Sequence, residues 1–311
     1  MRVFRGCSQP VPRPAALAIG NFDGVHLGHA ALLRRVRQVA QAGGWAPSVL
    51  SFEPHPREFF SPADAPARLS TLREKLGLLA GNGIEQTMIC PFNAKFAALT
   101  AEAFINEVLV RALRVQHVVI GDDFRFGAGR RGNFSMLCAA GENYGFSVES
   151  MGSVSVDGER VSSSGVRRAL AAGALDHAGR LLGRPYAIDG QVIHGRQLGR
   201  QLGFATANLR IKHNPLPMTG VFAVDVIGLD GTPLPGVANL GIRPTLEGTR
   251  PLLEVHLFDF DRNIYGSHIS VRFLRKLRDE QRFSDLGALK AQIAADAHAA
   301  RAFFAAAAPL S

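Results

Sequence analysis

Near the start of the chain, a glycine-rich segment lies between an apolar run and a helical pattern. Residues 20–29 read Gly-Asn-Phe-Asp-Gly-Val-His-Leu-Gly-His, and the five apolar residues 15–19 before them have the length of a buried parallel strand. Apolar residues then recur at helical spacing: Leu32, Leu33, Val36 and Val39. The pattern predicts a strand-to-helix turn, where free backbone N–H groups and the helix dipole favour an anion.

Two histidines in this turn strengthen the case for an anion. His26 and His29 flank Leu27-Gly28, so two imidazoles add hydrogen-bond donors while Gly28 lets a phosphate approach the backbone. A lone histidine at a helix start is usually a capping or surface residue, but the surrounding glycines and Asp23 favour a binding site here. A zinc pair is disfavoured because no third ligand lies at suitable spacing nearby. We interpret the segment as a phosphate site.

Composition sets wide limits on the class of protein. The 311 residues, 47% apolar and 20% charged, are typical of a soluble globular protein with one or two domains. No apolar run approaches the ~20 residues of a membrane span, and the basic N-terminus lacks the apolar core of a secretory signal. Cys7, Cys90 and Cys138 are scattered and odd in number. They predict free thiols and a cytoplasmic location.

The net charge of +9 raises nucleic acid as a partner. The arginines are dispersed, however, and no basic run is interleaved with aromatic residues in the manner of a single-strand binding platform. Anionic small molecules explain part of the surplus equally well. We therefore expect small-molecule partners, with neither nucleic acid nor a membrane among them.

Residues 1 to about 180 alternate apolar runs with helical patterns, which predicts parallel crossovers in a doubly wound sheet. The expected strands are 15–19, 48–52, 86–90 and 117–120, and the expected helices are 72–79 and 102–113. The segments 20–29, 52–56 and 121–127 each follow a predicted strand. Because ligands gather at the carboxyl ends of such strands, we expect the three segments to converge on one crevice.

The pattern changes near Gly183, where short alternating strands with glycine and proline turns begin. They predict an antiparallel barrel or sandwich, with a hairpin turn at 229–231. The expected strands are 190–194, 221–226, 252–258 and 268–273. An alanine-rich helix over 286–304 closes the chain. Two domains, 1–182 and 183–311, follow from this change.

The segment His26-Leu-Gly-His29 resembles the His-x-Gly-His signature of the nucleotidylyltransferase superfamily. Together with the motifs below, the chain is similar to the bacterial bifunctional riboflavin kinase/FAD synthetase family. The resemblance implies a Rossmann-like α/β nucleotidylyltransferase domain followed by an antiparallel riboflavin kinase β-barrel with a terminal helix. It also implies ATP with Mg²⁺, and the flavins riboflavin, FMN and FAD, as substrates and products.

At the first site the resemblance implies adenylyl transfer. The phosphate of FMN attacks the α-phosphorus of ATP and pyrophosphate leaves, so positioning and neutralisation of the phosphates carry the catalysis. The catalytic residues it implies are His26, His29 and Arg167, the last as a charge-assisted clamp. The binding residues it implies are Gly20, Phe22, Asp23, Gly28, His55, Asp123, Phe126 and Ser164.

Two further segments carry the resemblance in this half. Residues 52–56 match Phe-x-Pro-His-Pro, and 161–167 resemble Ser-Ser-Thr-x-Ile-Arg at the start of a serine-capped helix. Ser164 replaces the usual threonine and Val166 the isoleucine, and both substitutions are conservative. A core role for Phe126 in place of a pocket role is the alternative reading of its segment.

In the second half, residues 190–209 resemble the riboflavin kinase signature Gly-x-x-x-Gly-Arg-x-x-Gly-Phe-Pro-Thr-Ala-Asn. The alternative interpretation of these residues is a mobile surface loop without a binding role. The resemblance implies Mg²⁺ ligands at Thr206 and Asn208, whose oxygens suit that ion, and a general base at Glu254 for the ribityl hydroxyl. The binding residues it implies here are Gly195, Gly199, Gly203 and Arg243, the glycines as a backbone cradle for ATP phosphates.

Ala205 departs from the family proline. Alanine should loosen the backbone just before the metal ligands, so weaker pre-organisation of the loop is expected. Two alternatives to a bifunctional enzyme follow. One is an adenylyltransferase whose kinase half has decayed, and the other is a non-catalytic flavin- or RNA-binding regulator, whose nucleic-acid affinity would show a strong salt dependence.

Overall fold

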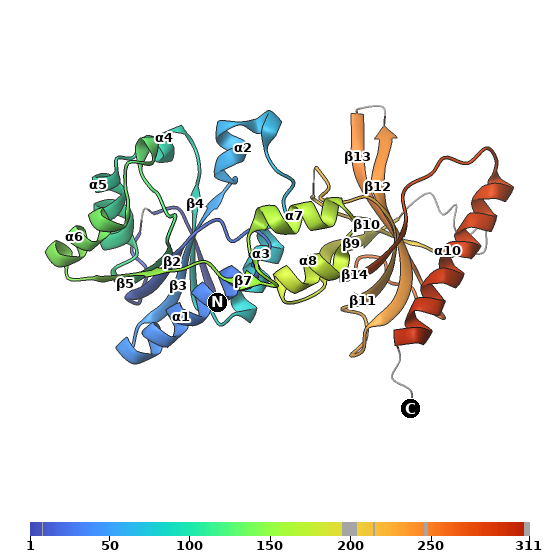
Figure 1. The fold of residues 1–311 in the computed structure, drawn as a ribbon, viewed down its shortest axis with the longest axis horizontal. Coiled ribbons are helices and arrows are strands. Elements are labelled where there is room, and N and C mark those ends of the chain that lie inside the picture. Colours follow the sequence, from blue (N-terminus) through green and yellow to red (C-terminus); the bar gives the residue numbers. More distant parts are fainter. Residues whose placement is uncertain (8, 195–203, 214, 246–247, 308–311) are drawn as a thin grey trace. The chain divides into compact units, whose positions relative to one another are not determined.

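The computed structural model describes residues 1–7, 9–194, 204–213, 215–245 and 248–307. Within it the chain forms two compact units, residues 1–66 with 72–162, and residues 67–71 with 163–311 (Figure 1). The predicted fold class is confirmed, because the first unit contains a parallel sheet flanked by helices and the second a closed antiparallel barrel.

The first unit is built on a six-stranded parallel sheet in the order β1-β4-β3-β2-β5-β6. Its strands are β1 (Arg2–Arg5), β2 (Ala15–Ile19), β3 (Ala46–Glu53), β4 (Gln86–Pro91), β5 (Val115–Gly121) and β6 (Ser147–Met151). Its helices are α1 (Leu27–Gly43), α2 (Pro56–Phe60), η1 (Pro62–Asp64), α3 (Leu72–Gly81), α4 (Ala94–Ala97), α5 (Ala101–Ala103), η2 (Phe104–Ala112), η3 (Ala128–Arg130) and α6 (Phe134–Tyr144). A short hairpin of β7 (Ser155–Val156) and β8 (Glu159–Arg160) completes it.

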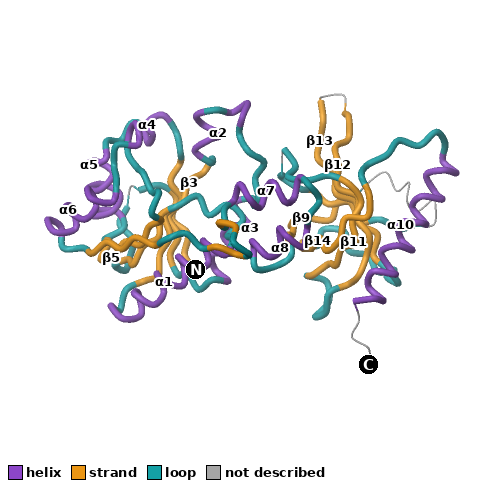
Figure 2. Tube along the Cα trace, in the orientation of Figure 1, coloured by secondary structure: helices purple, strands orange, loops and turns teal. Residues whose placement is uncertain are grey.

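Alternate residues of β2 belong to two separate hydrophobic cores, one on each face of the sheet. Leu17 and Ile19 pack with η2 and α6, whereas Ala16 and Ala18 pack with α1 and α3. A central strand buried on both faces explains why residues 15–19 are continuously apolar. The result is a three-layer arrangement with the sheet between two layers of helices (Figure 2).

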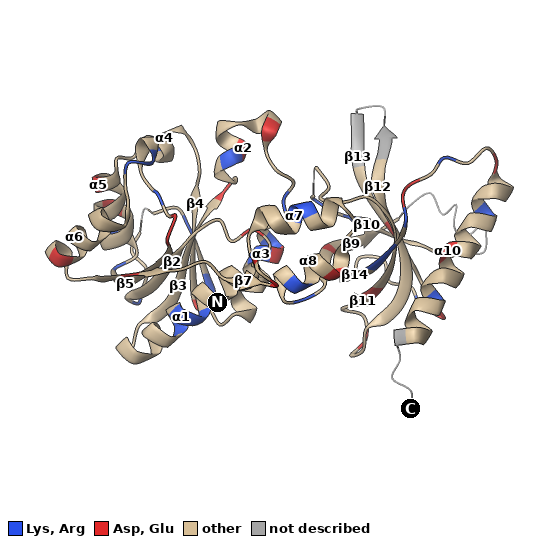
Figure 3. Ribbon diagram, viewed as in Figure 1, with Lys and Arg blue, Asp and Glu red and all other residues tan. Residues whose placement is uncertain are grey.

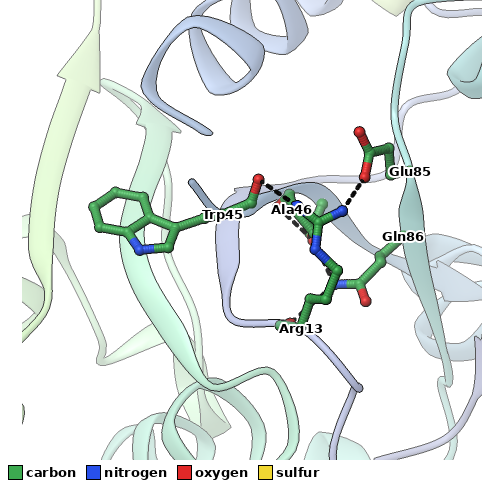
Figure 4. Close-up of polar contacts among 6 residues, drawn as sticks. Arg13, Trp45, Ala46, Glu85 and Gln86 are labelled. Atoms are coloured by element: carbon green, nitrogen blue, oxygen red, sulfur yellow. Dashed lines mark hydrogen bonds and ion pairs between the residues drawn. The ribbon is translucent and has the colours of Figure 1, made fainter. Parts of the chain in front are cut away.

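Polar contacts fix the chain just before β2 (Figure 4). Arg13 pairs with Glu85 at 2.5 Å and donates to the carbonyl of Trp45 at 3.3 Å, while the Gln86 side chain donates to the carbonyl of Arg13. The N–H of Ala46 donates to the Pro14 carbonyl. These contacts join the beginnings of three neighbouring strands and so set the register of the central sheet.

The second unit is a closed barrel in the order β10-β13-β12-β11-β14-β9, preceded by two helices. Its elements are α7 (Ser163–Ala171), α8 (Leu175–Leu182), β9 (Tyr186–Ile193), β10 (Ala207–Arg210), β11 (Gly220–Ile227), β12 (Leu234–Thr245), β13 (Gly248–Leu257), β14 (His268–Arg278) and α10 (Leu286–Ala307). The predicted hairpin at 229–231 is present, because β11 and β12 pair antiparallel on either side of it.

The terminal helix α10 packs against the barrel. Ala297 and Ala300 lie in an apolar cluster with Val221 of β11 and Val237 of β12. β14 carries a series of basic residues (Figure 3), and its Arg278 forms a two-pronged ion pair with Asp296 of α10, Nε–Oδ1 2.9 Å and Nη2–Oδ2 2.7 Å. Both apolar packing and a largely buried ion pair therefore hold the helix.

The compact units divide at 162/163, whereas the sequence predicts functional domains that divide at 182/183. The difference consists of α7 and α8, because α8 contacts β9 and β14 of the barrel. Among the residues that the structure describes, no helix is long and apolar enough to cross a membrane.

Candidate active sites

A cavity of about 290 Å³ opens at the carboxyl ends of β2, β5 and β6 in the first unit. The segments 20–29 and 121–127 both line it, so the structure brings together two of the three segments that were predicted to converge. Residues 52–56 are not among its lining residues. The lining includes Gly20, Phe22, His26, Gly28, His29, Asp123 and Arg160.

His26 and His29 form a stacked pair at the start of α1. Their ring centroids are 3.7 Å apart and their planes are inclined by 14°. His26 is the N-cap residue of α1, and its Nδ1 accepts a hydrogen bond from the backbone N–H of His29 at 3.3 Å. The two imidazoles therefore lie at the positive end of the helix dipole, where a phosphate is stabilised.

His29 is electrostatically unusual. Burial, with the nearby charges of His26 and Lys75, holds the pKa of His29 well below its ordinary value of 6.5. Its imidazole is therefore neutral at pH 7 and acts as a hydrogen-bonding group rather than a fixed charge. The Nδ1 atom of His29 is buried and makes no hydrogen bond within the described part of the chain. Such a polar atom is typical of a functional site rather than a settled core.

The buried Lys75 of α3 supplies a cationic charge close to this pair. Sequence reasoning missed Lys75, because a lysine in an amphipathic helix normally faces solvent and no motif marks it.

The backbone of this turn is strained where the site is formed. Phe22 and Val25 have positive φ values of 49° and 41°, a region that side-chain-bearing residues rarely adopt. Asp23 is buried between them. A Cβ atom at Gly28 would lie 3.2 Å from the Cε1 and Nδ1 atoms of His26, so the imidazole would have to shift by a few tenths of an ångström to admit a side chain.

At the mouth of the cavity, Asp123 pairs with Arg160 at 3.0 Å, and Asp122 lies 3.8 Å from the same guanidinium. Sequence reasoning missed Arg160, although the Asp-Gly pair just before it in the sequence indicates a hairpin turn. The residues Asp157-Gly158 form the turn between β7 and β8 with φ values of 52° and 80°, as the Asp-Gly pair of a tight hairpin does.

Two predicted binding residues have structural roles in this unit. His55 is the N-cap residue of α2. Its Nδ1 atom accepts a hydrogen bond from the backbone N–H of Arg57, and its backbone N–H donates to the carboxylate of Glu58. Phe126, predicted to shape the pocket, packs instead in the core against Phe104 and Phe124, with ring centroids 5.3 and 5.7 Å away. Phe124 is the aromatic residue of this segment that lines the cavity.

Ser164 and Arg167 belong to the second unit. Both lie on α7, where Ser164 is exposed and the guanidinium of Arg167 donates to the carbonyl of Ala67 at 2.6 Å. This bond ties α7 to residues 67–71 of the same unit. The predicted cooperation of Arg167 with the histidine pair stays a prediction.

A second cavity, of about 460 Å³, lies in the barrel unit. Thr206 lines it beside Ala205 and Ala207, and the segment 260–265 forms another wall. Tyr265 in this wall stacks on His194, with ring centroids 3.8 Å apart. The aromatic stack offers a flat surface of the kind that planar ligands use.

Asn208 and Glu254 lie directly opposite one another on β10 and β13. Opposed residues share a face of the sheet, so the structure brings together a predicted metal ligand and the predicted base. Asn208 is only 7% exposed, and its side-chain amide makes no hydrogen bond within the described residues. Their neighbours Ala207 and Val255 point to the opposite face and line the cavity.

Ala205 is held more firmly than the absence of proline suggests. The Nδ1–H group of His256 donates to the carbonyl of Ala205 at 2.8 Å. The imidazole of His256 also packs edge-on against Phe204 and Phe258. A side chain from β13 thus anchors the backbone immediately before Thr206, and this partly offsets the looseness expected from alanine.

The remaining predicted kinase residues are placed only in part. Gly195, Gly199 and Gly203 lie outside the described residues, and Arg243 is described only by its backbone position in β12.

Comparison with known proteins decides the family. The FAD synthetase family model matches residues 8–165, and the riboflavin kinase family model matches residues 182–304. The bifunctional riboflavin kinase/FMN adenylyltransferase of Escherichia coli (strain K12) is 49% identical over 98% of both chains. This chain belongs to that family. The members from Pseudomonas fluorescens and Haemophilus influenzae are 48% and 47% identical, over 96–97% of their lengths.

A solved structure supports the same fold across both units. It is described as a macrolide-efflux protein from Streptococcus pneumoniae, is 28% identical, and aligns with a TM-score of 0.81 over 97% of this chain and 99% of that one. This likeness extends the family's two-unit fold to a more distant sequence.

Proposed function

We propose that this member of the riboflavin kinase/FMN adenylyltransferase family makes FMN in the barrel unit and FAD at the histidine-lined cavity. The single observation that carries the assignment is the stacked pair His26 and His29 at the start of α1, inside a cavity at the carboxyl ends of parallel strands. The barrel unit also contains a cavity, although Asn208 and Glu254 lie on the strand face opposite to Ala207 and Val255, which line it.

Adenylyl transfer needs no general base, because the attacking FMN phosphate is already anionic. The oxygen of that phosphate bonds to the α-phosphorus of ATP while the bond to pyrophosphate breaks. We assign to His26, His29 and the α1 backbone N–H groups the task of binding the phosphates that change charge. Lys75 adds a favourable potential, and Arg167 is proposed as an additional clamp.

Riboflavin phosphorylation requires removal of a proton from the ribityl hydroxyl. We assign Glu254 as the base that accepts this proton while the hydroxyl oxygen attacks the γ-phosphorus of ATP and ADP leaves. Its place opposite Asn208 supports the assignment, because base and metal ligand must act on the same phosphate.

Thr206 and Asn208 fit a magnesium ion by their chemistry. Both offer neutral oxygen atoms, and the largely buried amide of Asn208 lacks a partner among the described residues. When bound, Mg²⁺ neutralises charge on the ATP phosphates. No cluster of three or more His, Cys, Asp or Glu side chains suited to a metal occurs in the described part of the chain. The phosphates of ATP would supply the other ligands.

Two variants test the assignment of each reaction to its site. His29→Ala is expected to lower FAD formation from FMN by roughly a hundredfold or more while riboflavin phosphorylation persists. Glu254→Gln is expected to abolish FMN formation while FAD is still made from added FMN. The exposed His298 of α10 provides the control His298→Ala, which should alter neither rate. Loss of both activities in either site variant would contradict the division.

The alternative of a decayed kinase rested on Ala205, and the hydrogen bond from His256 to its carbonyl weakens that argument. We further propose a cytoplasmic location, where ATP and riboflavin are available. Cell fractionation would test it.

A further inference from the structure

Two thiols that are 83 positions apart in the sequence lie side by side in the first unit. Cys7 follows β1, Cys90 lies near the end of β4, and their Sγ atoms are 2.9 Å apart. The parallel pairing of β1 with β4 produces this approach: Arg5 is opposite Ile89, and the N–H of Gly6 donates to the Ile89 carbonyl. The scattered cysteines of the sequence therefore include a pair that only the fold creates.

The two thiols differ in access to solvent. Cys90 is fully buried in the apolar core with Ile19, Leu50 and Met88. Cys7 is only half-buried and packs against the edge of that core. A reagent from solution therefore reacts with Cys7 before it reacts with Cys90.

The contact also makes the two thiols chemically unequal. The hydrogen bond between them lowers the pKa of Cys7 and raises that of Cys90, although burial and the charge of Glu107 oppose the change at Cys7. Of the two thiols, Cys7 therefore ionises more readily. The more readily ionised thiol at the accessible position, with a second thiol behind it, is the order that a disulfide-forming pair needs.

We propose that Cys7 and Cys90 are a site of reversible disulfide formation by small-molecule disulfides such as oxidised glutathione. The Cys7 thiolate attacks one sulfur of the oxidant, forms a mixed disulfide and releases one thiol. Cys90 then loses its proton, attacks the Cys7 sulfur and displaces the second thiol. Two protein thiols are oxidised, and one small-molecule disulfide is reduced to two thiols.

The geometry makes the second step short. A disulfide bond is about 2.05 Å long, so the sulfur atoms need to approach by only about 1 Å from their present separation. The bond would join the edge strand β1 to its neighbour β4 and close a long loop, which restricts the unfolded chain and raises the unfolding temperature of this unit.

Cys138, on α6, provides an internal control. It is half-buried like Cys7, but no sulfur partner lies beside it in the described structure. It should therefore react slowly and end as a mixed disulfide with glutathione, never as an internal bond.

The test is mass spectrometry of the folded protein after incubation with oxidised glutathione and alkylation of the remaining thiols. In the wild type and in Cys138→Ala we expect a Cys7–Cys90 cross-link, with loss of two hydrogens, that dithiothreitol reverses. In Cys90→Ala the reaction should stop with one glutathione on Cys7, and Cys7→Ala should leave Cys90 unmodified.

Melting curves give an independent readout. The oxidised wild type should unfold roughly 5 °C or more above the reduced form, and Cys7→Ala should show no such shift. Wild-type protein in which Cys7 and Cys90 both remain alkylatable, or in which only Cys138 carries glutathione, would overturn the proposal, whatever the folding of the variants.

Discussion

At the scale of single residues, the histidine pair depends on the absence of a side chain at Gly28. In Gly28→Ala the new Cβ atom would press on the His26 ring at 3.2 Å and displace it from its capping position. We expect FMN adenylylation to fall roughly tenfold or more, because small misplacements of reacting groups are costly, while riboflavin phosphorylation is unchanged. Rates of both reactions on the purified variant measure this.

Gly77→Ala is the matched control. Gly77 lies within α3 and a Cβ atom there meets nothing within 4 Å, so both rates should equal those of the wild type. Alanine is the better helix former at both positions, so lower helix stability cannot explain a loss at Gly28. Unchanged adenylylation in Gly28→Ala would show that the His26 ring is not needed where the structure places it.

The lowered pKa of His29 makes stability depend on pH. In the unfolded chain His29 has its ordinary pKa of 6.5, so it binds a proton as pH falls below that value, whereas the buried imidazole of the folded protein stays neutral. The free energy of unfolding therefore falls as pH falls from 7 towards 5. We expect His29→Gln to lose less stability over this range, by up to about 1.4 kcal/mol per pH unit. Urea unfolding at several pH values measures the slopes, and identical slopes would contradict the burial of a neutral imidazole.

The site residues that the sequence predicts best are those that lie close together within one short motif. His26, Gly28 and His29 occur within four positions, and a single turn places them in one cavity. Lys75 and Arg160 could not be predicted in the same way, because their approach depends on how α3 and the β7–β8 hairpin pack. For Phe126 the structure agrees with the alternative interpretation, because this ring packs in the core against Phe104, and its role in flavin binding stays a prediction.

Among the secondary-structure elements, the central strands of the parallel sheet were predictable, whereas its edge strands and two strands of the barrel were not. The predicted run 15–19 coincides with β2, because a strand buried on both faces is continuously apolar. β1 and β6 lie at the two edges of the sheet and carry polar residues, so they give a weak pattern. β10 and β12 in the barrel were missed because glycine, proline and polar residues interrupt their apolar pattern.

The attachment of α10 to the barrel gives a stability prediction. Asp296 and its partner Arg278 are both largely buried, so Asp296→Ala removes the carboxylate that pairs with a largely buried guanidinium. We expect the barrel unit to lose about 3 kcal/mol of unfolding free energy, measured by denaturant titration. Asp279→Ala, which removes the exposed partner of Lys276, should change it far less. Equal effects would contradict a structural role for the buried pair.

At the scale of the whole molecule, each cavity is lined by residues of one compact unit. A substitution of His29 or of Glu254 should therefore leave the other site intact, and FMN released by one molecule should serve another. We expect a mixture of His29→Ala and Glu254→Gln proteins to make FAD from riboflavin, after a lag, although neither variant does so alone. No FAD from the mixture, with each variant retaining its other activity, would contradict exchange of FMN through solution.

One chain carries out both reactions. The most direct measurement is a time course in which the purified protein is incubated with riboflavin, ATP and Mg²⁺ and the flavins are separated chromatographically. We expect FMN to appear first and then to be converted to FAD. FMN that accumulates without FAD would contradict the assignment of the His26/His29 cavity, and FAD from added FMN but no product from riboflavin would contradict the assignment of the barrel.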